Sequence, residues 1–302
     1  GDASPGLDNT GNRLPRVNAG ADQQLESNRF PFEVSLPATA EDDGLPNPPG
    51  KLTITWTQVS GPGIVTFTDA SLVNATANLP GVGTYELRLT ASDGVLQASD
   101  TVTLVVDRPT LLATFVTAGS QWKYLDNGSD QGTAWSEPGF SDAAWKTGKA
   151  QLGYGDGDEA KVVEDNATAG YNRADTDRYI TTYFRKTFPL TGVKGVTSLT
   201  VKLVRDDGGV VYLNGTEVFR SNMPEDFIDF TTPASEVVGG GDESNFFPRD
   251  VDPGLLREGN NVLAVEIHQQ SPTSSDISFD LELSGTVFPI NQAPTVSAGP
   301  EQ

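Results

Sequence analysis

Apolar and polar residues alternate along much of this chain, with the two-residue period of half-buried β-strands. Three such runs lie in the first third, at residues 52–57, 85–92 and 101–106, and sequences rich in Gly and Pro separate them. One face of each run is apolar and the other is polar, which predicts a sandwich of two sheets. Trp56 lies on the apolar side of its run, and we expect it in the core rather than on the surface.

The rest of the chain also predicts strands. The expected strands cover residues 179–188, 198–205, 210–213, 261–268 and 277–284. Asn214-Gly215 follows one of them and favours a type I′ hairpin turn, in which both central residues need a positive φ. Because no long segment shows a sustained helical period, the fold class is all-β.

Residues 221–252 interrupt this second set of strands. The segment holds eight acidic residues against one basic residue, Arg249, and has three glycines at its centre. We expect a long loop that is either functional or disordered.

An internal repeat indicates a modular organisation. Residues 12–23 and 291–302 share Asn, Pro, Val, Ala, Gly and Gln in register, so the chain is expected to end where another copy of its first module begins. The predicted parts are a linker (1–13), a first sandwich (14–107), a second β-domain (108–289) and the start of the repeat (290–302).

Two resemblances refine the fold. Residues 15–23, 56–63 and 83–94 resemble the PKD domain family in content and order, which implies an immunoglobulin-like sandwich acting as a spacer or weak binding unit. Residues 145–158, 205–224, 256–269 and 274–283 resemble the galactose-binding-like jelly rolls of secreted bacterial proteins. That resemblance implies a non-catalytic module, most often one that binds carbohydrate.

Composition narrows the function classes. The formal net charge is −21, which repels phosphate backbones and anionic lipid surfaces, so neither nucleic acid nor a membrane is an expected partner. The chain has no cysteine and one histidine, which argues against disulfides, thiolate chemistry and the usual zinc sites. We expect a secreted or cell-surface bacterial protein. The acidity is equally compatible with a solvated acidic surface and with calcium binding.

Arg205, Asp206 and Asp207 form the leading candidate site. The two carboxylates follow a predicted strand and precede a glycine pair, a combination that suits calcium or sugar hydroxyls. The step also resembles the paired-aspartate loop of protective-antigen-type lectin modules, which implies a calcium ion that holds sugar hydroxyls. The alternative is a structural turn in which Arg205 neutralises the acids.

A second acidic turn holds Asp156 and Asp158, which we predict as further metal ligands, although the residues after Asp158 lack the pattern of an EF-hand loop. A solvated turn is the alternative.

His268, Gln269, Ser275 and Asp276 are predicted to form a polar rim beside the paired aspartates. A Ser-His-Asp triad could be written from these residues, but the chain lacks a nucleophile-elbow sequence and a Gly-rich oxyanion loop, so we predict no catalytic residue. Rings that could stack on a sugar are expected to be mostly core. They are Trp122, Tyr124, Trp135, Tyr154, Tyr171 and Tyr179.

The sequence therefore predicts a non-catalytic, calcium-stabilised fragment of a multidomain protein that binds a polysaccharide or cell-surface glycan. Neighbouring modules of the same protein would be its other partners. Two alternatives stay open: a structural spacer or adhesin stalk without glycan affinity, and a glycan-degrading enzyme domain.

Overall fold

The computed structural model describes residues 11–48, 50–155, 157, 159–163 and 178–289. These residues divide into two compact units, the first running to Pro109 and the second starting at Thr110. The division lies two residues beyond the boundary expected after Asp107. The predicted repeat at 290–302, like Asp156, Asp158 and Tyr171, lies outside the described residues.

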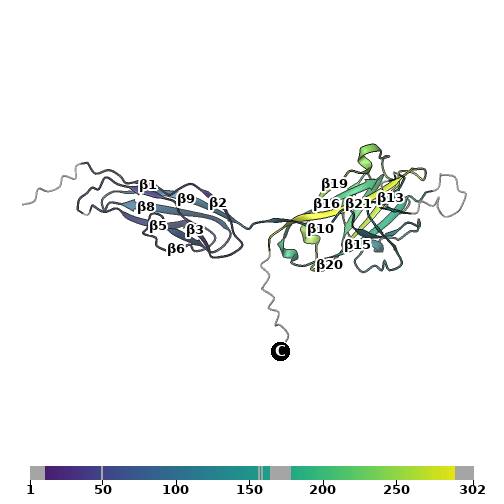
Figure 1. Cartoon of the computed structure of the whole chain (residues 1–302), viewed down its shortest axis with the longest axis horizontal. Helices are drawn as coiled ribbons and strands as arrows, with labels where there is room; N and C mark the ends of the chain where they lie inside the picture. The colour runs from purple at the N-terminus through teal and green to yellow at the C-terminus, as the bar shows by residue number, and fades with distance from the viewer. Residues whose placement is uncertain (1–10, 49, 156, 158, 164–177, 290–302) are drawn as a thin grey trace, which may run out of the picture. The chain divides into compact units, whose positions relative to one another are not determined.

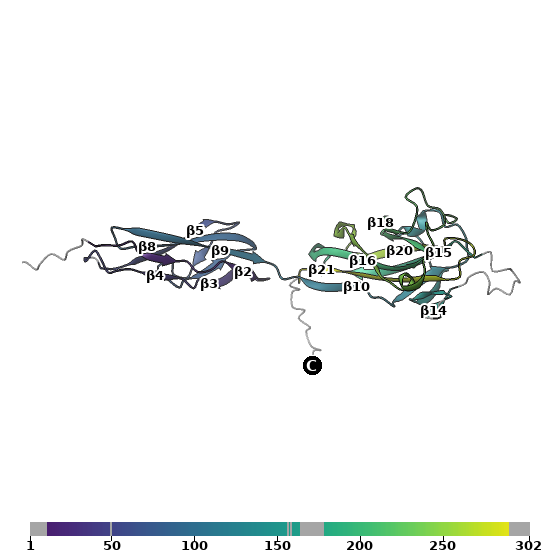
Figure 2. The same ribbon diagram turned by 90° about the horizontal axis from the view of Figure 1, so that it is seen from above.

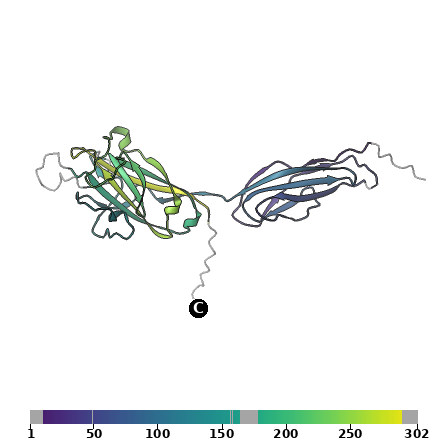
Figure 3. The same cartoon turned by 180° about the vertical axis from the view of Figure 1, so that it is seen from behind.

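The first unit is built from strands throughout its described part (Figures 1 and 3). One sheet has the order β2-β9-β8-β5 and a second has the order β3-β7-β6, while β1 pairs with β4. The strands are β1 (Arg16–Asn18), β2 (Gln23–Glu26), β3 (Phe32–Ser35), β4 (Thr39–Glu41), β5 (Thr53–Ser60), β6 (Thr66–Phe67), β7 (Thr76–Leu79), β8 (Gly83–Ser92) and β9 (Gln97–Asp107).

The core of the first unit lies on the faces that the alternation predicted. Tyr85, Leu87 and Leu89 of β8 are completely buried, and the residues between them are more exposed. Trp56 is 2% exposed, its indole nitrogen donates to Val73 O at 3.1 Å, and its ring stacks on Phe67. The expectation that Trp56 belongs to the core is therefore confirmed.

The second unit is a sandwich of two six-stranded sheets, which Figure 2 shows as two layers. In one sheet the order is β14-β13-β21-β16-β19, with β10 also paired to β21. Its strands are β10 (Leu111–Val116), β13 (Leu152–Tyr154), β14 (Lys161–Val162), β16 (Val196–Asp206), β19 (Phe247–Val251) and β21 (Ile277–Val287).

The facing sheet has the order β12-β11-β15-β20-β17-β18, and every pair in it is antiparallel. Its strands are β11 (Gln121–Leu125), β12 (Lys146–Lys149), β15 (Thr181–Leu190), β17 (Gly208–Leu213), β18 (Thr216–Ser221) and β20 (Gly259–His268). The helical turns are η1 (Ala134–Ser136), η2 (Val193–Gly195), η3 (Gly240–Glu243) and η4 (Pro253–Leu255). Across the described ranges, no helix is long and apolar enough to span a membrane.

The core between these sheets follows the predicted alternation. Leu199, Val201 and Leu203 of β16 face Leu263 and the other apolar residues of β20 inside one buried cluster. The turn between β17 and β18 also agrees with the sequence, because Asn214 has φ 52° and Gly215 has φ 88°. A positive φ at both positions is the property of a type I′ turn.

The acidic segment 221–252 departs from the expectation of a long unstructured loop. It contains η3 and the edge strand β19, which pairs with β16 from Leu199 to Leu203. Backbone pairing of its last residues, which alternation alone does not reveal in so acidic a segment, makes it part of the sandwich.

We predict that Trp56→Ala destabilises the first unit by about 3–5 kcal/mol, because the substitution leaves a large cavity and an unpaired carbonyl. Hydrogen exchange of the β5 and β8 amides in the full chain measures the loss. Ile64→Ala is the control, since Ile64 is 83% exposed. Equal exchange rates in the two variants would contradict the core assignment.

Candidate functional site

The chain crosses from one sheet of the second unit to the other at the paired aspartates. β16 ends at Asp206 and β17 begins at Gly208 in the facing sheet, so Asp207 alone lies between them. Asp206 pairs with Ser278 at the start of β21, and Gly208 pairs with His268 at the end of β20. The predicted site residues are thus brought to one end of the sandwich.

Asp207 is completely buried, and its carboxylate accepts three hydrogen bonds from two separate loops. Its Oδ1 accepts from the backbone N–H of Val238 at 2.7 Å. Its Oδ2 accepts from Gln270 N at 2.8 Å and from Ser274 Oγ at 3.2 Å. The Asp207 carboxylate therefore ties the acidic segment and the β20–β21 loop to the sheet crossing.

The glycine after this pair is required by close packing. A Cβ at Gly208 would lie 2.6 Å from Met223 Sδ and 2.7 Å from Asn222 O, distances that a real side chain does not tolerate. The sequence predicted that the glycine pair admits a closely approaching backbone. In the structure that backbone belongs to the start of the acidic segment.

Asp206 is also completely buried, but its environment is the opposite of that of Asp207. Neither Oδ1 nor Oδ2 of Asp206 has a hydrogen-bond partner among the described residues. Burial, followed by the nearby charges of Asp207 and Asp276, raises the pKa of Asp206 from 3.8 to about 9. A buried carboxyl group without donors is costly unless a proton or a cation neutralises it.

Arg205 does not satisfy this carboxyl group through a hydrogen bond. Its Nε donates to Ser221 Oγ at 3.0 Å, and its guanidinium carbon lies 4.2 Å from the centre of the Phe247 ring. Within the described part of the chain its Nη1 has no acceptor. Arg205 is thus a neighbouring positive charge that is held by Ser221 and Phe247.

His268 and Gln269 lie beneath the surface, since both side chains are 0% exposed. The predicted polar rim is thus covered at these two residues, because loops lie over the end of β20, and their role in binding stays a prediction. Gln269 Nε2 donates to the Tyr154 hydroxyl at 2.5 Å. Gln269 Oε1 has no partner among the residues that are described, so it is a second buried oxygen at this end of the sandwich.

Ser275 and Asp276 lie in the loop that follows. Ser275 is exposed and Asp276 is half-buried, and Ser275 Oγ donates to Asp276 Oδ1 at 3.1 Å. His268 Nδ1 contacts neither Ser275 nor Asp276. It lies 2.8 Å from Thr232 O and 3.0 Å from Thr181 Oγ1. The Ser-His-Asp triad that could be written from the sequence is not assembled by these contacts.

The buried oxygens at this end supply only part of the coordination shell of a calcium ion. Calcium takes six to eight oxygen ligands, and Asp206 and Gln269 supply three buried oxygens without hydrogen-bond donors. Over the described ranges, however, no three His, Asp or Glu side chains are grouped to hold a metal ion. A cation here would need backbone oxygens or water in addition to Asp206. The predicted ligands Asp156 and Asp158 fall outside the described ranges.

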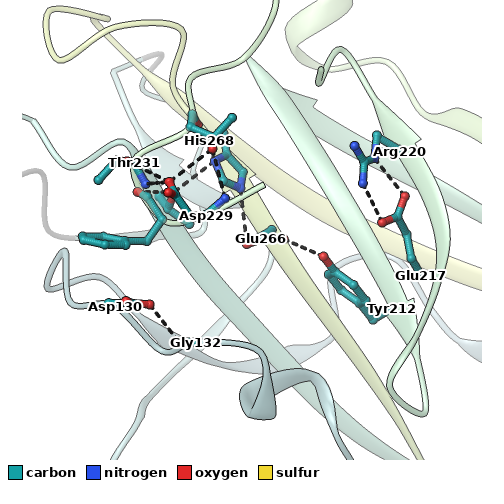
Figure 4. Close-up of polar contacts among 12 residues, drawn as sticks. Asp130, Gly132, Tyr212, Glu217, Arg220, Asp229, Thr231, Glu266 and His268 are labelled. Carbon is teal, nitrogen blue, oxygen red and sulfur yellow. Dashed lines mark hydrogen bonds and ion pairs between the residues drawn. The ribbon is translucent and has the colours of Figure 1, made fainter. Parts of the chain in front are cut away.

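A second feature of the unit is a pocket of about 650 Å³ on the outer face of the sheet that contains β15, β20 and β17. Its floor includes Glu266, which pairs with Tyr183 across β15 and β20. Tyr212 Oη donates to Glu266 Oε1 at 2.8 Å, and Glu266 Oε2 lies 3.3 Å from His268 Nε2 (Figure 4).

Glu266 and His268 lie on the face of β20 opposite Leu263 and Val265, which belong to the core between the sheets. Sequence reasoning did not find the pocket above Glu266. The walls come from η1 and from residues 227–230, which are distant in the sequence. One signal in the sequence could have indicated a buried Glu266. It follows four consecutive apolar residues, so both faces of its strand are apolar at that point. Most of the aromatic candidates are buried as expected: Trp122, Tyr124, Trp135 and Tyr154.

Comparison with known proteins identifies the class of the first unit. Residues 19–106 match the family model "K319L-like, PKD domain", which confirms the PKD resemblance. Among solved structures, the PKD domain from KIAA 1837 protein is 27% identical, covers 30% of this chain and 85% of that chain, and has a TM-score of 0.26.

Other similar structures are parts of larger enzymes. Bacteroides uniformis beta-glucuronidase 2 is 16% identical over 59% of this chain, with a TM-score of 0.38, and only 18% of that enzyme is covered. A beta-glucuronidase from an uncultured Clostridium species is 15% identical over 60% of this chain, at a TM-score of 0.36, and 30% of it is covered. The chain thus corresponds to less than a third of either enzyme.

We predict that, in a chelating buffer, the second unit loses stability as the pH rises from about 4 to about 9. The unfolded chain ionises Asp206 near its usual value of 3.8 while the folded chain keeps it protonated to about 9, so the unfolded state gains stability over that window. Asp206→Asn mimics the protonated form and is expected to be about 1–3 kcal/mol more stable than the wild type near pH 8. Urea unfolding across the pH range measures both effects, and equal pH slopes for the two proteins would refute them.

Asp207→Ala is predicted to destabilise the second unit, whereas Asp206→Asn is predicted to stabilise it. Asp207→Ala removes the acceptor of Val238 N, Gln270 N and Ser274 Oγ, and we expect a loss of about 2–4 kcal/mol. Urea unfolding measures the loss, and hydrogen exchange of the Val238 and Gln270 amides locates it. Asp226→Ala, on the exposed part of the same segment, is the control and should change stability by less than about 0.5 kcal/mol.

Proposed function

We propose that the second unit is a non-catalytic, calcium-dependent carbohydrate-binding module of a secreted or cell-surface bacterial protein, and that the PKD domain is its spacer. The observation that carries the proposal is the Asp206 carboxyl group, which is buried without a hydrogen-bond donor. A divalent cation would satisfy both of its oxygens at once.

The surrounding charge supports a cation at this position. Asp207, Asp276 and Glu243 all lie close enough to raise the pKa of Asp206 after burial itself, while the basic groups nearby are Arg205, beside Asp206 and Asp207, and Arg178, which donates to Ser275 O. Acidic groups therefore outnumber basic ones around a buried carboxyl. Adding a divalent cation would relieve their mutual repulsion.

The carbohydrate part of the proposal rests on the resemblance to galactose-binding-like jelly rolls. The second unit has the two-sheet sandwich that such a module requires. Ser275 and Asp276 lie at the outer edge of the same end, one exposed and one half-buried, where sugar hydroxyls could reach their oxygens. The polysaccharide would then bind next to the cation, with Arg205, His268 and Gln269 supporting the loops beneath it.

The test compares the wild type with Asp206→Asn in calcium and in chelator. We expect calcium at a hundredfold excess over Kd to stabilise the wild type by about 2.7 kcal/mol and so to raise its melting temperature. The melting temperature of Asp206→Asn should not change with calcium. Asp226→Asn carries the same charge change on the surface and should respond like the wild type. Calorimetry with calcium measures the affinity directly.

Glycan arrays probed with and without calcium then test the ligand. Calcium-dependent binding to one class of glycan, lost in Asp206→Asn, supports the proposal. Calcium stabilisation without glycan binding would favour a stalk segment stiffened by calcium. The proposal fails altogether if calcium neither binds nor stabilises the wild type.

A further inference from the structure

The pocket above Glu266 is separate from the Asp206 site, and its lining has a distinct chemistry. It is enclosed by η1, by the loop before η1 and by residues 227–230, over the outer face of the central strands (Figure 4). At about 650 Å³ it falls within the range of small-molecule sites.

Carboxylates and aromatic rings dominate the lining. The acidic residues are Asp130, Glu137, Asp229 and Glu266, and the aromatic residues are Trp135, Tyr183, Tyr212, Phe227 and Phe230. Within the described residues, no Lys, Arg or His lines the pocket. The four carboxylates of the lining repel anionic ligands, and the nearest cation, Arg185, is buried behind the lining, where it donates to Trp135 O and Glu137 O.

The acids occupy two levels. Glu266 is 5% exposed and is held on the floor by the Tyr212 hydroxyl, whereas Asp130, Glu137 and Asp229 are exposed at the rim. Hydrogen bonds from Thr231 lower the pKa of Asp229, so that carboxylate is ionised at neutral pH. The rim therefore adds negative charge to that of Glu266 on the floor.

The carboxylates of the pocket also affect the pKa values of its two tyrosines, Tyr183 and Tyr212. Burial raises the pKa of Tyr183, and the charges of Glu266, Asp130 and Asp229 raise it further. Burial followed by Glu266 does the same for Tyr212. Both phenols stay neutral, and their rings remain electron-rich surfaces beside the carboxylates.

The rings are arranged at steep angles to one another. Trp135 meets Tyr183 at 61° with centroids 4.7 Å apart, and it meets Tyr212 at 81° with centroids 5.6 Å apart. Phe227 is 79% exposed, so its ring is accessible to a ligand in the pocket. Trp135 and Tyr183 are 3% and 2% exposed, so the rings within reach of a ligand are Tyr212, Phe230 and Phe227. Together with the carboxylates they supply the two interactions that bind organic cations, namely charge pairing and cation–π contact.

We propose that this pocket binds a small organic cation carrying an ammonium group. The ammonium would lie among the aromatic rings above Glu266, and the rim carboxylates would attract it from solution. This assignment does not depend on calcium or glycan binding, because neither Asp206 nor Asp207 lines the pocket.

Choline and its neutral isostere, in which carbon replaces the ammonium nitrogen, form the test pair because they share shape and differ in charge. We expect calorimetry on the full chain to detect choline but not the isostere, with an affinity that falls as ionic strength rises. Undetectable choline binding, or equal binding of the two compounds, would overturn the proposal.

Substitutions locate the site. Glu266→Gln should weaken choline binding at least about tenfold, since it removes the buried charge. Glu137→Gln is the second variant, because Glu137 is exposed and the change should leave folding intact while weakening binding about threefold. Glu33→Gln, an exposed change of the same kind in the first unit, should bind choline as the wild type does. This location is refuted if Glu137→Gln and a folded Glu266→Gln both bind choline with the affinity of the wild type.

Discussion

The second unit depends on one short crossing between its two sheets. Two consecutive strands, β16 and β17, belong to opposite sheets, and a single residue, Asp207, joins them. So short a crossing buries polar backbone and side-chain groups at the end of the sandwich. Buried polar groups must find partners, and the way in which each one does so determines the local structure.

Asp206 and Asp207 meet this requirement in different ways. Asp207 faces the loops and receives three hydrogen bonds from residues between 30 and 70 positions further along the chain. Asp206 receives none within the described ranges, so its charge is left to be neutralised by a proton or by a cation. The same residue type thus provides a structural anchor at one position and a candidate ligand at the next.

The outer face of the β15-β20-β17 sheet shows how polar groups can be buried without belonging to the hydrophobic core. Leu263, Val265 and Ile267 pack between the sheets, whereas Glu266 and His268 lie beneath loops on the other side. The pocket exists because η1 and residues 227–230 cover this face only in part. A strand that would ordinarily present a solvated face instead carries a charged floor.

Local patterns were sufficient for the fold class and for the longest strands. Alternation located the main strands and the core faces of β8, β16 and β20, and Asn214-Gly215 determined its turn, because side-chain period and backbone φ are local properties. Alternation could not reveal β19, whose pairing with β16 brings an acidic segment into the sheet. It also could not show that His268 and Gln269 are buried, that Asp207 is saturated with donors while Asp206 is not, or that Glu266 floors a pocket. Each of these depends on residues far apart in the sequence that meet only after folding, and so the tertiary structure alone decided them.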